Sequence, residues 1–149
     1  MSTRQIRPVS AADHPAWLPL WQSYQRFYNA EIAADISALT WQRFLDPSEP
    51  MHAALAWQDG VAVGLVHWIF HRSCWTVSDY CYLQDLYVAE TVRGGGVGRA
   101  LIGPVYAAAQ AAGANRVHWL TQANNTQARQ LYDRIASHSG FVQYRRLFS

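Results

Sequence analysis

One short stretch restricts the fold of this chain more than any other, because it carries four glycines between a strand pattern and a helix pattern. Residues 93–100 read RGGGVGRA, and the apolar, strand-like run Tyr82–Val88 precedes them. Behind the glycines, apolar residues recur at intervals of 4, 4, 3 and 4 at Val97, Leu101, Val105, Ala108 and Ala112. These intervals describe one face of a helix, so the stretch predicts a strand, a glycine loop and a helix in succession.

A glycine loop that opens a helix presents unpaired backbone N–H groups at the positive end of the helix dipole. Such an end binds phosphate readily, and glycine lets the amides point at oxygen atoms without a Cβ in the way. Arg93 and Arg99 add positive charge at the rim of the loop. The alternative interpretation is a flexible connector, although such connectors seldom lie between so regular a strand and helix.

Spacing narrows the class of phosphate ligand. A nucleotide P-loop has the form G-x-x-x-x-G-K-[ST], and no lysine follows any glycine here. The dinucleotide fingerprint G-x-G-x-x-G also fails in both registers, because its third glycine position holds Arg99 in one and Leu101 in the other. The pattern that remains is R-x-x-G-x-G.

Length and composition limit the remaining possibilities. A chain of 149 residues, half of them apolar, fits one domain spanning residues 1–149. The net charge of +2, with scattered basic residues, argues against a nucleic-acid partner. Cys74 and Cys81 lack the spacing of a metal site or a disulfide framework, and no apolar leader or membrane-length segment is visible. We therefore expect a cytoplasmic protein without a metal or a membrane partner.

Patterns along the rest of the chain predict further elements. Asp59-Gly60 indicates a hairpin between strands at 51–58 and 61–72. The remaining predicted elements are an edge strand at 5–9, a helix with an aromatic face from Trp17 to Tyr28, a loop at 30–37, a short helix at 40–45, a strand at 116–121, a helix near 125–135 and a closing strand at 142–148. A helical crossover makes the 116–121 strand parallel to the 82–88 strand.

Two motifs in the second half of the chain, in this order, resemble one known family. The pattern R-x-x-G-x-G resembles the pyrophosphate-binding signature of the GNAT superfamily of acetyl-CoA-dependent N-acyltransferases. Asn125, Ala128, Leu131 and Tyr132, followed by Gly140-Phe141, look like its N-x-x-A-x-x-L-Y...G-F element. The match covers about residues 82 to 148, and the strand around Leu83–Val88 is most similar to the diamine and histone/polyamine acetyltransferase branch.

This resemblance implies an α+β (mixed α/β) domain with a mostly antiparallel sheet of six to seven strands and about four helices. It also implies a splayed pair of parallel strands that admits the pantetheine arm of acetyl-CoA. The residues that the resemblance assigns to the cofactor are Leu86, Tyr87, Val88, Arg93, Gly94, Gly95, Gly96, Val97, Gly98, Arg99, Asn125 and Tyr132. The backbone N–H near Val88 is the expected oxyanion donor, and Tyr132 is the expected general acid that protonates the leaving thiolate.

The identity of the general base stays open at this point. An acceptor amine is mostly ammonium at neutral pH, and only its neutral form attacks a thioester. Related amine acetyltransferases often place a glutamate where Gln84 stands. Asp85 is adjacent, although strand alternation predicts that it points to the opposite face. Glu31, Asp79 or a water chain are the alternatives, and Glu31 could also belong to an acidic rim that attracts amines.

The leading hypothesis is therefore an enzyme that moves an acetyl group from acetyl-CoA to a primary amine, either a small amine or polyamine or a protein lysine. The rival hypotheses are a non-catalytic acyl-CoA sensor or interaction module, which Gln84 would favour, and ordinary nucleotide binding by the loop. The closing strand through Phe148 offers a sheet edge at which two copies could pair as a homodimer.

Overall fold

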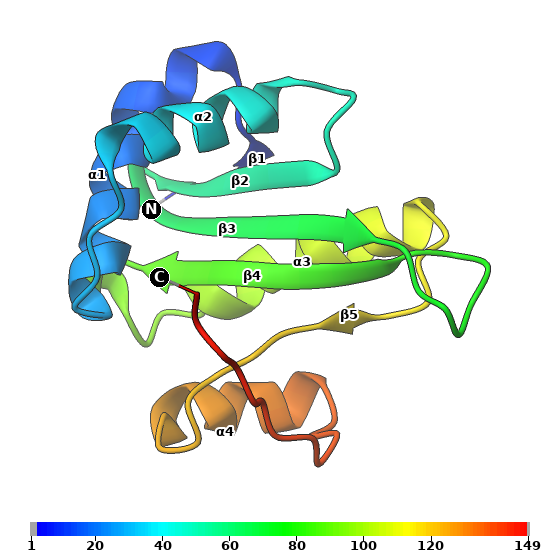
Figure 1. The fold of residues 1–149 in the computed structure, drawn as a ribbon. Helices are drawn as coiled ribbons and strands as arrows, with labels where there is room; N and C mark the ends of the chain where they lie inside the picture. The colour runs from blue at the N-terminus through cyan, green and yellow to red at the C-terminus, as the bar shows by residue number, and fades with distance from the viewer. Residues whose placement is uncertain (1–2, 149) are drawn as a thin grey trace. The chain divides into compact units, whose positions relative to one another are not determined.

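The computed structural model describes residues 3–148, which fall into two compact units divided between Trp119 and Leu120. The first unit contains a five-stranded sheet with the strand order β1-β2-β3-β4-β5 (Figure 1). Its strands are β1 (Arg4–Pro8), β2 (Met51–Gln58), β3 (Val61–His71), β4 (Tyr80–Val88) and β5 (Val117–His118). Its helices are α1 (His14–Phe27), α2 (Ala34–Leu45) and α3 (Val97–Ala111), with short 3-10 turns at Ala11–Asp13 and Glu90–Val92.

The sheet combines an antiparallel meander with one parallel pair, as the sequence predicts. β1 pairs antiparallel with β2, β2 with β3, and β3 with β4, whereas β4 and β5 are parallel. The turn between β2 and β3 has positive φ at both Asp59 (51°) and Gly60 (81°). This is the backbone that a two-residue hairpin turn requires, so the predicted hairpin is confirmed.

One face of the sheet carries α1, α2 and an aromatic core. The aromatic face predicted for the first helix is buried at Trp17 and Trp21, while Phe27 and Tyr28 at its end are exposed. Trp17 stacks on Trp21, with ring centroids 5.8 Å apart, and lies 5.0 Å from Trp41 of α2. Leu55 of β2 and Leu65 of β3 complete this cluster from the sheet. Burial of these large rings supplies most of the driving force that holds the two helices on the sheet.

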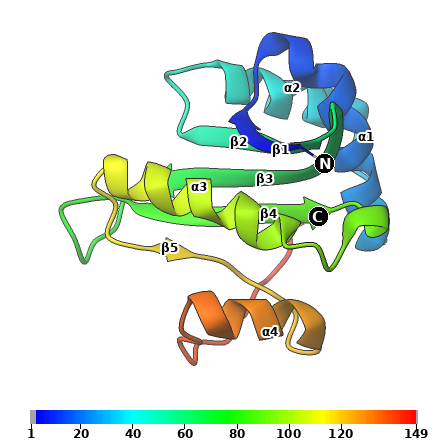
Figure 2. The same ribbon diagram turned by 180° about the vertical axis from the view of Figure 1, so that it is seen from behind.

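The opposite face of the sheet is covered by α3, which Figure 2 shows in front of β3 and β4. The helix buries Val97, Leu101 and Val105, three of the positions that the sequence pattern predicts. Gly64 of β3 lies directly under its first turns, where an added Cβ would meet Leu101 Cδ1 at 3.0 Å. The missing side chain at this position thus lets the start of α3 lie close against the sheet.

Two elements of the first unit differ in length from their predictions. α2 begins at Ala34, whereas the pattern placed 30–37 in a loop and started a helix at 40. Tertiary contacts explain the longer helix, because Ser37 is buried and accepts a hydrogen bond from Trp21 Nε1 at 3.0 Å. The strand expected at 116–121 is reduced to Val117–His118, the only two residues of β5 that pair with β4.

The second unit contains α4 (Thr126–Ile135), the predicted last helix, with Asn125 at its N-cap position. The closing strand expected at 142–148 is wrong, because the described residues from 136 to 148 form no helix or strand. A strand exists only where its backbone pairs with a neighbour, and alternating apolar residues do not provide that partner. The sheet therefore has five strands in place of the expected six to seven. No helix within residues 3–148 is both long and apolar enough to cross a membrane.

Candidate active site

The glycine loop joins β4 to α3 and leaves a run of backbone amides open. Gly94 and Gly96 have φ values of 85° and 83°, in the left-handed region that favours glycine, and Gly96 is the N-cap residue of α3. The first hydrogen bond of the helix runs from Ala100 N to Gly96 O at 3.0 Å. Among residues 3–148, none accepts a hydrogen bond from the N–H groups of Gly94 to Arg99. The amides predicted to bind phosphate are therefore available to an anion.

Three arginines belong to the glycine loop or contact it. Arg4 of β1 donates a hydrogen bond from Nη2 to the carbonyl oxygen of Gly95 at 2.8 Å. Arg93 donates from Nε to the carbonyl oxygen of Val88 at 2.9 Å, and its guanidinium lies over the ring of Phe27 at 5.4 Å. Arg99 is exposed on the first turn of α3. The positive charge expected at the rim is present, and Arg4 adds a cation from a distant strand.

The edge of β4 beside the loop is open. β5 pairs with Cys81 and Tyr82 only, so within the first unit no strand pairs with β4 on that side from Leu83 to Val88. Ala89 N donates to Val63 O at 2.8 Å, and Val88 lies opposite Gly64 in the register. Because antiparallel residues alternate between bonded and non-bonded pairs, the N–H of Val88 points away from β3. The predicted parallel pair is confirmed, and within the first unit the N–H of Val88 has no strand partner.

A β-bulge in β4 corrects the prediction for Asp85. Leu83 pairs with Trp68 and Asp85 pairs with His67, so Gln84 is the extra residue of the bulge. Simple alternation would place Asp85 on the same face as Leu83, which is buried on the α3 side. The bulge instead turns Asp85 toward the α1 face, where its Oδ2 lies 2.9 Å from His67 Nδ1. Gln84 itself is exposed.

Phenol rings gather around the Asp85 carboxylate. Burial, the charge of Asp85 and a hydrogen bond to it raise the pKa of Tyr24 far above its ordinary value. Burial and the charge of Asp85 also raise the pKa of Tyr82. Tyr24 lies edge-on to Tyr28, with ring centroids 5.1 Å apart, and to Tyr87 at 6.0 Å. The neutral phenols of Tyr24 and Tyr82 thus border a carboxylate whose side chain is 13% exposed.

An open depression lies at the end of α1, beside the end of β4. It is lined by Ser23, Arg26, Phe27, Tyr87 and Glu90. Tyr87 contacts Tyr24, and the Arg93 guanidinium lies over both Tyr87 and Phe27. Through these two lining rings the depression adjoins Tyr24 and the Arg93 guanidinium.

The other predicted site residues lie elsewhere. Glu31 is exposed in the loop between α1 and α2, and it forms no ion pair with any residue in the described range. Asp79 precedes β4 and is nine residues from Val88, about 30 Å along an extended strand. Its distance from the oxyanion donor removes it as a candidate base. Asn125 and Tyr132 belong to the second unit, where Asn125 Nδ2 donates to Thr121 Oγ1 at 3.3 Å.

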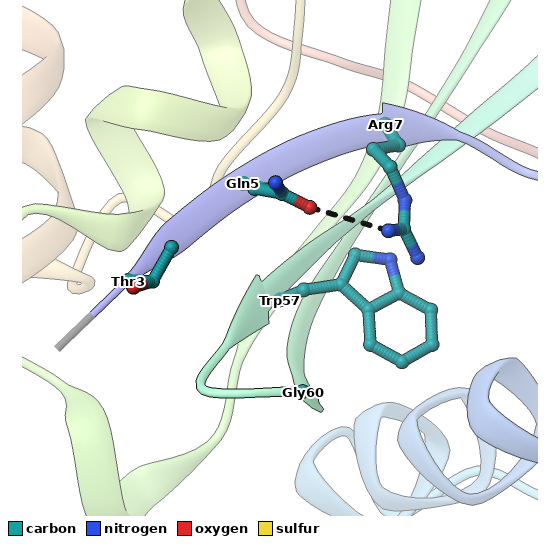
Figure 3. A pocket seen from close by; sticks show the side chains of 5 residues that line it. All are labelled: Thr3, Gln5, Arg7, Trp57 and Gly60. Carbon is teal, nitrogen blue, oxygen red and sulfur yellow. Dashed lines mark hydrogen bonds between the residues drawn. The ribbon is translucent and has the colours of Figure 1, made fainter.

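A second depression lies at the edge strand, and Figure 3 shows its lining of Thr3, Gln5, Arg7, Trp57 and Gly60. The Arg7 guanidinium covers the Trp57 ring at 4.7 Å, and Arg7 Nη1 donates to Gln5 Oε1 at 3.2 Å. Strand alternation directs these side chains away from the face that Arg4 uses to reach the loop. This depression therefore holds no group that acts on the candidate site.

Sequence reasoning missed two features of the site. Nothing in the local pattern around Arg4 links it to a loop 91 residues later. The second feature is His67, which is buried with only 2% of its surface exposed and yet pairs with Asp85. The signal that could have suggested this pairing is a histidine within an otherwise apolar central strand, because a buried polar group needs a partner.

Comparisons with known proteins agree with this geometry. The sequence model described as the acetyltransferase (GNAT) family matches residues 14–136. The D-amino-acid N-acetyltransferase HPA3 of Saccharomyces cerevisiae is 36% identical over 143 residues, which cover 95% of this chain and 89% of the yeast protein. The fold and the site thus define an acyltransferase.

Solved structures share the fold at low sequence identity. A ribosomal-protein-alanine N-acetyltransferase from Brucella melitensis biovar Abortus 2308 superposes with a TM-score of 0.81 at 23% identity, covering 97% of this chain and 99% of that one. The aminoglycoside N-acetyltransferase AAC(6')-Iy in complex with CoA gives 0.84 at 18% identity, covering 99% and 96%. The chain described here belongs to the acetyltransferase (GNAT) family.

Proposed function

We propose that this protein transfers the acetyl group of acetyl-CoA to a primary amine by direct attack in a ternary complex. The observation that carries the proposal is the open amide run at Gly94–Arg99 beside the unpaired edge of β4. The amides and the three arginines suit the diphosphate of coenzyme A, and the β4 edge offers hydrogen bonds to an extended pantetheine arm. Leu86, Tyr87 and Val88 would then border the thioester.

In this mechanism the neutral amine attacks the thioester carbonyl carbon, and a C–N bond forms as the C–S bond breaks. The N–H of Val88 stabilises the developing oxyanion, and such a donor is typically worth about 3–4 kcal/mol of barrier. Asp85 accepts the proton that the amine nitrogen loses, directly or through one water. The proton that Tyr132 donates converts the departing thiolate to free CoA.

Two other residues keep their predicted roles within the proposal. Asn125 would hydrogen-bond the pantetheine arm, and Glu31 would belong to an acidic rim that draws cationic amines toward the site. Glu31→Gln is then expected to raise KM for amines of high positive charge without changing kcat.

Because the family match spans both units, we infer that residues 1–149 act as a single catalytic domain.

The relatives suggest the acceptor class. The name of HPA3 gives D-amino acids as its acceptors, and the name of a structural neighbour with the same fold gives aminoglycosides. We infer that a small amine is the first acceptor to test. Polyamines and lysine peptides, the acceptors that the diamine and histone/polyamine branch suggests, come next. The depression beside Tyr87 is open, so it imposes no narrow tunnel on the substrate.

The test is a thiol-release assay with acetyl-CoA over a panel of D- and L-amino acids, aminoglycosides, polyamines and lysine peptides. Mass spectrometry should find one added acetyl group on the amine of each accepted substrate. Asp85→Asn should lower kcat by about 100-fold or more, as expected for loss of a general base, while the Kd of acetyl-CoA stays constant. Tight acetyl-CoA binding without turnover of any amine would contradict the proposal and favour a sensor.

We also infer that two copies associate through the C-terminal segment 141–148. This segment exposes Phe141, Tyr144 and Phe148 at 87%, 92% and 89% of their surfaces, which is unusual for large rings in a monomer. Light scattering should report a dimer, and Phe141→Ser with Phe148→Ser should shift it to monomer. Val77→Ser, at another fully exposed apolar position, is the matched control. A wild-type monomer at high concentration would contradict this inference.

A further inference from the structure

A chain of hydrogen bonds runs through the core from α1 to Asp85. Trp17 Nε1 of α1 lies 3.0 Å from His67 Nε2 of β3, and His67 Nδ1 lies 2.9 Å from Asp85 Oδ2 of β4. The bulge at Gln84 places Asp85 opposite His67 and so completes the chain. Each of the three groups comes from a different element, and the middle one is buried with 2% of its surface exposed.

The partners of His67 determine its tautomer. An indole N–H can only donate, so His67 Nε2 must accept with its lone pair. The single ring proton then sits on Nδ1 and is donated to Asp85. A second proton on Nε2 would face the Trp17 N–H at 3.0 Å with no acceptor between them. The rings of Trp21 and Phe44, with centroids 5.1 and 4.6 Å from that of His67, leave no polar alternative beside it.

A neutral His67 leaves the negative charge of Asp85 uncompensated. Within the described part of the chain Asp85 forms an ion pair with no arginine, and the phenols of Tyr24 on α1 and Tyr82 on β4 face it. Those phenols are neutral at physiological pH, so neither of them supplies a cation that would pair with Asp85. A primary ammonium is such a cation, and phenol faces favour its binding.

We propose that Trp17 and His67 are positioning residues that hold Asp85 as an oriented, fully charged carboxylate for the incoming ammonium group. This inference rests on the proposed function, since Asp85 is the proton acceptor there. His67 orients the carboxylate through Nδ1–H, and Trp17 keeps His67 from taking a second proton. The acceptor is accordingly a cationic amine that binds as ammonium and loses its proton to Asp85 before attack.

Two substitutions of similar size separate orientation from packing. In His67→Asn the side-chain amide lies near the former Nδ1 and can still donate to Asp85, whereas in His67→Gln it lies near the former Nε2 and engages Trp17. His67→Asn should keep kcat within a few fold of wild type. His67→Gln should lower kcat by about 100-fold, the cost of a small misplacement of a reacting group, with the Kd of acetyl-CoA unchanged. Equal losses in both variants at equal thermal stability would overturn the proposal.

Trp17→Phe tests the hydrogen bond between Trp17 and His67. Phenylalanine keeps the aromatic packing and removes the donor that faces His67 Nε2, so this nitrogen is free to bind a second proton and neutralise Asp85 as the pH is lowered. The ratio of variant to wild-type kcat/KM should fall as the pH is lowered from 8 to 6, because the amine titrates identically in both proteins. A ratio independent of pH would contradict the role of Trp17.

A spectroscopic measurement separates failure of this inference from failure of the proposed function. The imidazole ¹⁵N shifts of His67 in the wild-type protein should show the Nδ1–H tautomer throughout pH 5–8, whatever the acetyltransferase activity. An Nε2–H tautomer, or protonation of His67 in that range, would overturn the positioning role even in an active enzyme. Because the spectrum needs no variant, it also decides the matter if a substitution prevents folding.

Discussion

Arg4 and Gly95 are joined by a hydrogen bond of 2.8 Å from the guanidinium Nη2 to the backbone carbonyl oxygen. The first strand of the sheet thereby holds the loop that opens α3, although 91 positions separate the two residues. This hydrogen bond restrains the Gly95 peptide, and no described residue accepts from the neighbouring N–H groups of the loop. Arg4 also brings a positive charge to the place where a diphosphate would bind.

Arg4→Ala should weaken CoA binding by about 10-fold, the typical effect of losing a hydrogen bond that involves a charged group. The Kd for pantetheine, which lacks the diphosphate, should not change. Isothermal titration with both ligands measures the difference. Arg7→Ala on the opposite face of the same strand is the control, and an equal effect from Arg7→Ala would show that the strand matters only for folding.

Gly96→Ala should raise the Kd for CoA by 10-fold or more. Alanine at a φ of 83° costs roughly 1–2 kcal/mol, and relief of that strain would rotate the N-cap amides. Gly103→Ala is the matched control on the same helix, because its added Cβ meets no atom within 4 Å. The control should bind CoA like wild type and unfold at the same or a slightly higher temperature.

Gly64→Ala should destabilise the protein by about 1–3 kcal/mol, the usual cost of overpacking. Its Cβ would lie 3.0 Å from both Leu101 Cδ1 and the Tyr87 carbonyl oxygen, so the start of α3 must move away from β3. Thermal unfolding should show a lower Tm, and CoA affinity should fall with it. Unchanged stability would mean that α3 does not depend on this close approach.

Tyr132→Phe should lower kcat by about 100-fold and leave the Kd of acetyl-CoA nearly constant, because the phenol acts as a general acid only once the C–S bond breaks. Pre-steady-state kinetics with acetyl-CoA and an accepted amine provide the measurement. The neighbouring Leu131→Met serves as a packing control. A Tyr132→Phe variant with full turnover would remove Tyr132 from the mechanism.

Stability should fall on acidification below neutral pH. Burial, together with the nearby His71 and Arg116, lowers the pKa of His118 below the ordinary histidine value, and burial does the same for the pKa of His52. Below about pH 6.5 the unfolded chain therefore binds more protons than the folded protein. The free energy of unfolding is highest above that pH and decreases as the pH falls through the folded-state pKa values. His118→Gln should reduce the difference in Tm between pH 7.5 and pH 5, whereas the exposed His138→Gln should leave it unchanged.

Local patterns predicted the elements that depend on near neighbours. The Asp59-Gly60 turn, the glycine loop and the buried face of α3 appear as expected, because turn angles and the repeat of an α-helix are set by residues within a few positions. The same patterns placed Gly94 to Arg99 at the start of a helix, and the structure shows their amides open. The parallel pairing of β4 and β5 followed from the helical crossover between them.

The amino-acid sequence by itself determined the strand, glycine loop and helix unit and the hairpin, because these form from short-range steric preferences and periodic burial. Only the tertiary structure decided that Arg4 reaches Gly95, that a bulge at Gln84 turns Asp85 toward His67, and that residues 142–148 form no strand. Each of these depends on strand register or on a distant partner. A local pattern specifies neither, because it records which face is apolar and not which residue lies opposite.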